Sequence, residues 1–213
     1  MKKIITLAML LLIVFVGAVF ASPYWTLYQL KNAYDAKDTQ AITAHIDFGK
    51  LQQSLKAQLT PVLVAKVEHV TASPILQALN LNVDADSMVS KMVNRAVENT
   101  VTENGVNNLL NGQTTLASLD SNAKLLGGLT AVAMDKIDVK DLIMARSQDE
   151  LSEKLKQQLS QPNPNAVTVK DSANYCGFNC FAVNTQVRGY PITVNMERQG
   201  FVNWKVAGVK LPI

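Results

Sequence analysis

Hydrophobic residues in the first three quarters of the chain recur every three or four positions, which is the period of amphipathic helices. The clearest case is residues 86–101, whose apolar positions share one side of a helix while most charged positions share the other. That apolar face carries Met88, Val89, Met92, Val93, Ala96, Val97 and Val101. Residues 22–161 are therefore predicted to be mainly helical.

Proline and short polar residues divide this helical part into segments. Ser22 and Pro23 predict the start of a helix that runs to Lys37, followed by a short helix over residues 39–46. Asp47 is expected to cap a third helix, in which Pro61 kinks or restarts the helix. The remaining predictions are a break at Ser73-Pro74, short helical turns over residues 103–124, a buried helix over 125–134 and a last helix over 141–160.

From residue 166 onward the apolar period changes to two, which is the period of a strand with one buried face. Alternating sets predict four strands, around residues 167–169, 181–187, 192–196 and 202–206. A phase slip at Ala207-Gly208 predicts a β-bulge. The expected fold class is α+β. Residues 166–213 form a four-stranded antiparallel meander whose apolar face is covered by the helices of the same domain, residues 22–213.

The amino terminus is typical of an export signal, because two lysines precede an unbroken apolar run, residues 4–20. Val19 and Ala21 are small enough for the −3 and −1 positions of a cleavage site. The run is also near the lower length limit for a membrane span. Residues 1–21 are therefore either a signal peptide or a membrane anchor.

Aromatic residues directly after the run favour the uncleaved anchor. Tyr24, Trp25 and Tyr28 stand where the interfacial aromatic belt of a membrane span would lie. No cysteine follows the run closely, so the lipid-modified form of export has no attachment point. If uncleaved, residues 4–20 would bind the chain to the membrane.

The charge of the exported part excludes one class of partner. Without residues 1–21 the chain keeps 18 of its 20 basic residues and all 17 acidic ones, so it is almost neutral. A nearly neutral protein without a cluster of Lys or Arg has no field that attracts polyanions. Binding to nucleic acid is not expected.

Both cysteines of the chain, Cys176 and Cys180, flank residues 177–179, which predict a three-residue hairpin loop. Two thiols across a tight hairpin of an exported protein are expected to form a disulfide, which contributes about 2 kcal/mol. A zinc site needs two more ligands, and His45 and His69 lie far upstream in predicted helices. A redox site of the thioredoxin type needs two residues between the cysteines, not three. A structural disulfide is predicted, with no metal and no cofactor.

Segments near both ends of the chain resemble a known family. They are residues 22–38 (SPYWTLYQLKNAYDAKD), 46–48 (IDF), 51–56 (LQQSLK) and 204–212 (WKVAGVKLP). These segments are similar to a bacterial envelope family catalogued as domain of unknown function 2939. The family has no established activity, cofactor or catalytic residue. The resemblance therefore implies a domain type and a location: the inner membrane facing the periplasm, or the periplasm itself if the signal is cleaved.

A looser similarity, at the level of the fold alone, is to the cone-shaped domains of nuclear transport factor two and the cystatin-like group. In these domains helices and a curved antiparallel sheet enclose a cavity. Phe181, Met196 and Trp204 would line the concave side of such a sheet as a pocket, or they would fill it as core.

Catalytic motifs are absent from the sequence: it has no nucleophile elbow, phosphate-binding loop, zinc-protease helix or dinucleotide fingerprint. The nearest arrangement is His45-Ile46-Asp47, which could transfer a proton if it lined a cone-type pocket, although a solvated helix end is the simpler interpretation.

A non-catalytic envelope protein is expected, not an enzyme. It would be a binding or assembly module that packs the face of residues 88–101 on an envelope protein partner, or a periplasmic carrier of a small apolar ligand.

Overall fold

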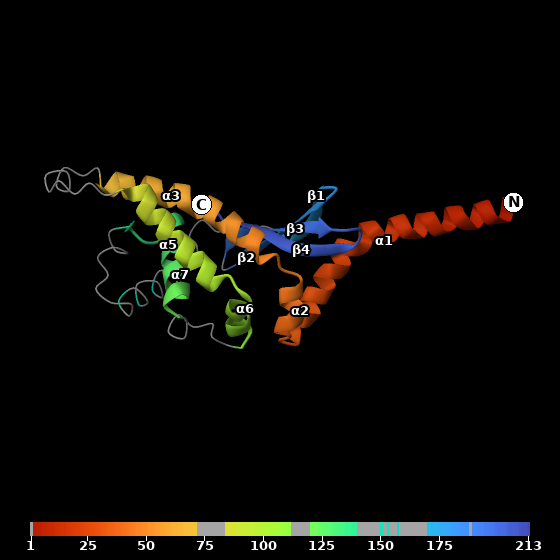
Figure 1. Ribbon diagram of the computed structural model, residues 1–213, viewed down its shortest axis with the longest axis horizontal. Helices are drawn as coiled ribbons and strands as arrows, with labels where there is room; N and C mark the ends of the chain where they lie inside the picture. Colours follow the sequence, from red (N-terminus) through yellow and green to blue (C-terminus); the bar gives the residue numbers. More distant parts are fainter. Residues whose placement is uncertain are drawn as a thin grey trace.

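The structure is a computed structural model that describes residues 2–71, 84–111, 120–139, 150, 153, 157, 170–187 and 189–213. Figure 1 shows α3, α5 and α7 side by side at one end of the molecule, the sheet in the middle, and α1 extending away at the other end. All of the helices precede the sheet along the chain. The predicted α+β class is confirmed.

Helix α1 (Lys2–Asp35) corrects the prediction that a helix begins at Ser22, because it passes through Ser22 and Pro23 without a break. Proline has no amide hydrogen to donate to the carbonyl four residues earlier, which here belongs to Val19. The Ser22 hydroxyl donates to that carbonyl instead, with an O–O distance of 2.7 Å. The helix therefore tolerates Pro23, and the apolar run is continuous with the folded domain.

Two further helices follow a sharp reversal at Lys37, whose φ is +53°. Helix α2 (Thr39–Ala44) is capped by Asp38, and helix α3 (Phe48–Thr71) runs through Pro61 without restarting. The Asp47 carboxylate accepts a hydrogen bond from the Lys50 amide at 3.1 Å, so the predicted cap of this helix is confirmed.

Three more helices each begin at a side-chain cap: α5 (Ala85–Thr100) at Asp84, α6 (Glu103–Leu110) at Thr102 and α7 (Ser121–Ala133) at Asp120. The predicted helices over residues 86–101 and 125–134 correspond to α5 and to most of α7. The apolar face of α5 is buried within the chain against α3 and α7. This aliphatic core contains Leu59, Leu63, Val67, Val89, Val93, Ala96, Val97, Leu129 and Val132 among its buried residues.

Several predictions fall outside the described residues. They are the break at Ser73-Pro74, almost all of the helix over residues 141–160, and the start of the first strand at residues 167–169.

The sheet consists of β1 (Ser172–Gly177), β2 (Cys180–Val187), β3 (Tyr190–Gln199) and β4 (Asn203–Lys210), paired in sequence order and antiparallel throughout. The predicted four-stranded meander is confirmed. In β4, Ala207 is the extra residue, because Val206 pairs with Met196 and Gly208 with Asn195. The predicted bulge is thus also confirmed.

The first hairpin differs from its prediction. Gly177 pairs with Cys180, so the turn contains two residues, Phe178 and Asn179, instead of three. The register shifts between Tyr175 and Gly177, which leaves Cys176 as an unpaired extra residue in β1. The longer spacing between the cysteines is therefore taken up by a bulge and not by the loop.

The free edge of β4 is covered by the segment between α2 and α3. The Val206 amide donates to the His45 carbonyl at 2.8 Å, and the Asp47 amide donates to the Val206 carbonyl at 2.9 Å. Helix α3 then passes over β4 at Gly208, where an added Cβ would lie 3.0 Å from the Ser54 hydroxyl. A glycine at this position permits the close approach of helix and strand.

Candidate functional site

The junction between α1 and the sheet is built around an aromatic cluster. Phe181, Met196 and Trp204 are fully buried, at 0% exposure, and they point to the same face of the sheet. Tyr175 contacts the rings of Phe181 and Trp204 edge-on, with centroid distances of 5.2 and 5.8 Å. Tyr24 of α1 contacts Phe181 at 4.9 Å. The three predicted site residues are thus brought together, and they are packed as core against α1.

Two hydrogen bonds also join the sheet to α1. The Trp204 indole N–H donates to the Ser22 hydroxyl at 2.8 Å, and the Tyr175 hydroxyl donates to the Phe20 carbonyl at 3.0 Å. Ser22 is buried, with 7% exposure. These bonds join the sheet to α1 on both sides of Ala21, where the candidate cleavage site lies.

Arg198 ties the tips of two hairpins together beside this cluster. Its guanidinium donates to the Phe178 carbonyl in the β1–β2 turn at 3.2 Å and to the Phe201 carbonyl in the β3–β4 turn at 2.7 Å. The same group lies over the rings of Phe178 and Trp204, at 4.8 and 4.6 Å from their centroids. An arginine with two carbonyl acceptors and two aromatic faces holds both turns in one arrangement.

The hairpin tips expose large apolar side chains. Phe201 is 74% exposed, Phe178 is 67% exposed and Val202 is 46% exposed. The Phe201 ring contacts the ring of Phe15 in the apolar run of α1, with centroids 6.3 Å apart. We call Phe178, Phe201 and Val202 the tip residues.

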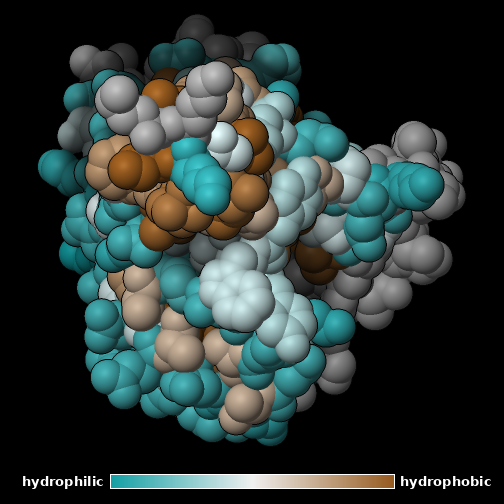
Figure 2. Space-filling view, turned by 90° about the vertical axis from the view of Figure 1, so that its right-hand side faces the viewer, coloured by the Kyte–Doolittle hydropathy of each residue, from teal (hydrophilic) through white to brown (hydrophobic). Residues whose placement is uncertain are grey.

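The apolar run itself is exposed along most of its length. The helical stretch Lys3–Asp35 is long and apolar enough to cross a membrane, and almost all of its most apolar part is exposed. Figure 2 views the molecule from the side to which the amino terminus points, and its largest hydrophobic area lies above the centre of this face. Large exposed side chains in the run include Ile4, Leu7, Leu10, Leu11, Ile13, Val14 and Phe15.

The Cys176–Cys180 disulfide is present, and its Cα atoms are 5.1 Å apart. It closes the first hairpin directly behind the Phe178 tip. A disulfide at this position is consistent with an oxidising compartment.

His45 and Asp47, the candidate acid–base pair, belong to the segment that covers the edge of β4. Their backbones bond to Val206, and the Asp47 carboxylate caps α3 and accepts from the Gln199 amide at 3.3 Å. The described residues contain no cluster of three or more His, Cys, Asp or Glu side chains that could hold a metal ion.

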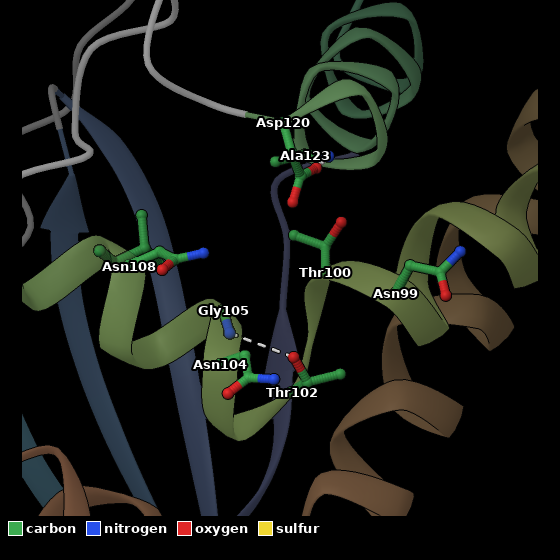
Figure 3. Close-up of a pocket in the computed structure, with 9 residues that line it drawn as sticks. Asn99, Thr100, Thr102, Asn104, Gly105, Asn108, Asp120 and Ala123 are labelled. Atoms are coloured by element: carbon green, nitrogen blue, oxygen red, sulfur yellow. Dashed lines mark hydrogen bonds between the residues drawn. The ribbon is translucent and has the colours of Figure 1, made fainter.

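A small cavity of about 80 Å³ lies where α5 ends and where α6 and α7 begin. In Figure 3 the Asp120 carboxylate points toward Thr100 across this space. The Thr100 hydroxyl is buried and has no hydrogen-bond partner. Ligand pockets usually start at about 300 Å³, so this cavity has room only for a few water molecules.

Two ionisable groups that interact with side chains of β3, Tyr175 and Lys50, have shifted pKa values. Burial raises the pKa of Tyr175 above its ordinary value, and the Arg198 charge opposes the shift. The hydrogen bond and ion pair with Glu197 raise the pKa of Lys50. The Lys50–Glu197 pair links the first turn of α3 to β3, on the face opposite to the aromatic cluster.

Two features of this junction were missed by the sequence analysis: the role of Arg198 and the position of the tip residues. Arg198 follows Met196 by two positions in β3 and therefore points to the same face of the sheet. An arginine in phase with the apolar positions of a strand was the available signal. No local pattern indicated that Phe201 would contact Phe15.

Comparison with known proteins gives a match to a family model. No curated protein and no solved structure matches the chain. Residues 12–109 match a family model described as a protein of unknown function (DUF2939). The match includes the quoted segments 22–38, 46–48 and 51–56, whereas the segment from Trp204 onward lies outside it. The matched stretch begins inside the apolar run and ends in the last turn of α6, and over these residues the chain is similar to DUF2939.

Proposed function

We propose that α1 is retained as a membrane anchor and holds a non-catalytic α+β domain on the periplasmic face of an inner membrane. There the domain acts as a binding or assembly module for an envelope protein partner. The observation that carries the proposal is the pair of bonds from Trp204 to Ser22 and from Tyr175 to Phe20. Cleavage after Ala21 would remove Phe20 and also Val19, whose carbonyl accepts from the Ser22 hydroxyl.

The length of α1 supports a span. A hydrocarbon core of about 30 Å needs about 20 helical residues, so a span that starts at Ile4 reaches the level of Pro23. Tyr24, Trp25 and Tyr28 follow at that level and are half or more exposed. Their position is that of an interfacial belt.

The orientation follows from the two ends of the span. Lys2 and Lys3 favour a cytoplasmic amino terminus, which puts the domain on the opposite side. The Cys176–Cys180 disulfide suits an oxidising compartment there. Both features agree with a periplasmic domain.

The carrier of a small apolar ligand is the weaker alternative. It requires open space between the sheet and α1, and Phe181, Met196 and Trp204 fill that region with no exposed surface. A ligand would have to displace these side chains.

The anchor is tested with the full chain and a matched Ala21→Leu variant, which removes the small residue that cleavage requires. We expect both proteins to stay in the membrane pellet after an alkaline wash and to show the intact mass of the whole chain less two hydrogens. A wild-type chain that begins at Ser22 and leaves the membrane, while the variant stays, would overturn the proposal.

The non-catalytic role is tested separately with His45→Ala. We expect cells that carry this variant to keep the phenotype of the wild type, because the His45 backbone, which bonds to β4, is unchanged. Loss of function in a variant that folds and reaches the membrane normally would favour the enzyme alternative.

A further inference from the structure

We infer that the tip residues, Phe178, Phe201 and Val202, insert into the lipid bilayer next to α1 and give the domain a second membrane contact. The inference rests on the proposed anchoring of α1 and adds the lipid surface as the ligand of the sheet. The tip residues belong to the two turns at one end of the meander, the end that faces α1.

The tip residues are exposed at a place where turns usually carry small or polar side chains. Turns favour glycine, asparagine, aspartate and serine, because these residues fit turn backbones and are well solvated. The two turns here contain Asn179 and Gly200, but they also present two phenylalanines at 67% and 74% exposure, together with Val202. Exposed apolar groups that gather in one place mark an interaction surface.

The position of Phe201 along α1 indicates that lipid, and not water or a protein, surrounds the tip residues. Phe201 contacts Phe15, which lies five residues before Phe20, or about 7.5 Å further along the helix. Residues on both sides of Phe15 are exposed and apolar. If the apolar run spans a bilayer, the Phe201 ring cannot remain in water, because it is level with the hydrocarbon around Phe15.

The Arg198 guanidinium lies near the level at which the proposed span ends. Its guanidinium lies over Trp204, and the Trp204 indole bonds to Ser22, close to where a span from Ile4 ends. A cation at this level can reach lipid phosphates while its apolar stem stays buried. Arg198 also holds the Phe178 and Phe201 turns together through their carbonyls. The result is an apolar tip below a charged group, an arrangement that matches the layers of a bilayer interface.

The second contact has a consequence for the domain. A single helix would let the domain swing on the membrane surface, whereas a helix with an adjacent inserted tip sets its tilt and rotation. The helices α3, α5 and α7, which lie at the far end of the molecule, would then be held away from the bilayer (Figure 1).

The test uses full-length protein in vesicles of phosphatidylcholine and phosphatidylglycerol, with and without bromine atoms on the acyl chains of the phosphatidylcholine. Bromine quenches tryptophan fluorescence only at close range. Single tryptophans are introduced as Phe201→Trp, Leu12→Trp and Val187→Trp, each in a Trp25→Phe background. All of these positions are exposed, so folding is preserved, and Trp204 gives the same background in each.

Leu12→Trp reports the insertion of α1, and Val187→Trp is the matched control, because Val187 ends β2 at the opposite end of the sheet. Once the signal of the Trp25→Phe protein, which contains Trp204, is subtracted, we expect Phe201→Trp to lose fluorescence to a similar extent as Leu12→Trp, and Val187→Trp to lose none. Quenching of Leu12→Trp without quenching of Phe201→Trp would overturn the inference and leave the anchor standing. If neither position is quenched, both the inference and the anchor are wrong.

Discussion

The aromatic cluster at the α1–sheet junction and the aliphatic core of α3, α5 and α7 are stabilised in different ways. The first joins residues far apart in the sequence through a few large side chains, and Ser22 and Trp204 are 182 positions apart. The second joins neighbouring helices through many Leu, Val and Ala side chains. Dispersion and burial have no preferred direction, whereas the indole and phenol groups each require a partner.

The two regions differ in how firmly they fix the position of a helix. The buried side chains of the aliphatic core are apolar, so they impose no hydrogen-bond direction on their helices. The aromatic cluster fixes α1 at one height and one rotation, since Trp204 bonds to Ser22 and Tyr175 bonds to Phe20. The junction therefore fixes the position of α1 relative to the sheet.

The largest expected effect comes from Trp204→Ala. Removal of a fully buried indole should lower the free energy of unfolding by about 3–5 kcal/mol, measured with denaturant on the full chain in detergent micelles. Leu63→Ala in the helical core should cost about 2–5 kcal/mol. Amide exchange over residues 20–30 should rise in the first variant only. Equal protection of α1 in both variants would contradict the proposed difference between the regions.

The exposed Trp25 is the control for this pair. Trp25→Ala should leave the unfolding curve in micelles almost unchanged, because its side chain is 59% exposed. A loss as large as that of Trp204→Ala would mean that the packing of α1 has been assigned to the wrong side of the helix.

Ser22→Ala tests the directional part of the junction. It leaves the buried Trp204 N–H and the Val19 carbonyl without their partner and should cost about 1–3 kcal/mol. Thr130→Ala is the counterpart in α7, where the hydroxyl donates only to the Leu126 carbonyl of the same helix, at 2.8 Å. We expect a clearly smaller loss for Thr130→Ala in the same unfolding measurement, and equal losses would refute the distinction.

Reduction of the Cys176–Cys180 disulfide should have a smaller effect, at most about 2 kcal/mol, because the closed ring is short. The expected loss would appear in unfolding curves with and without reductant. The Cys176→Ser/Cys180→Ser double variant should not respond to reductant. A response from that variant would show that the change arises elsewhere.

The smallest effect concerns alkaline pH. Burial raises the pKa of Tyr175 above 10.0, so the unfolded chain loses this proton first as the pH rises. The contribution of Tyr175 is complete below pH 10.0 and is lost above it, up to the pKa in the folded protein. Unfolding free energies of wild type and Tyr175→Phe should therefore differ less as the pH rises through this window. A constant difference would show that Tyr175 does not titrate differently in the folded state.

Much of the architecture could be predicted from local pattern. The helical period of residues 86–101, the alternation of the strands, the bulge at Ala207 and the pairing of two cysteines four positions apart are all set by neighbouring residues. The turn between the cysteines was predicted one residue too long, because a bulge and a longer loop give the same spacing.

By itself, the sequence determined the order of helices and strands, the apolar run and the disulfide, since each depends on residues within a few positions of one another. The tertiary structure alone decided that α1 continues through Pro23, that Arg198 joins two turns and that Phe201 reaches the level of Phe15. Each of these features depends on a contact with another element, so no local period carries it. The buried Ser22 hydroxyl is an example. It donates a hydrogen bond to the Val19 carbonyl within α1, which is a local contact, and it accepts one from the Trp204 indole near the other end of the chain, which no local pattern predicts.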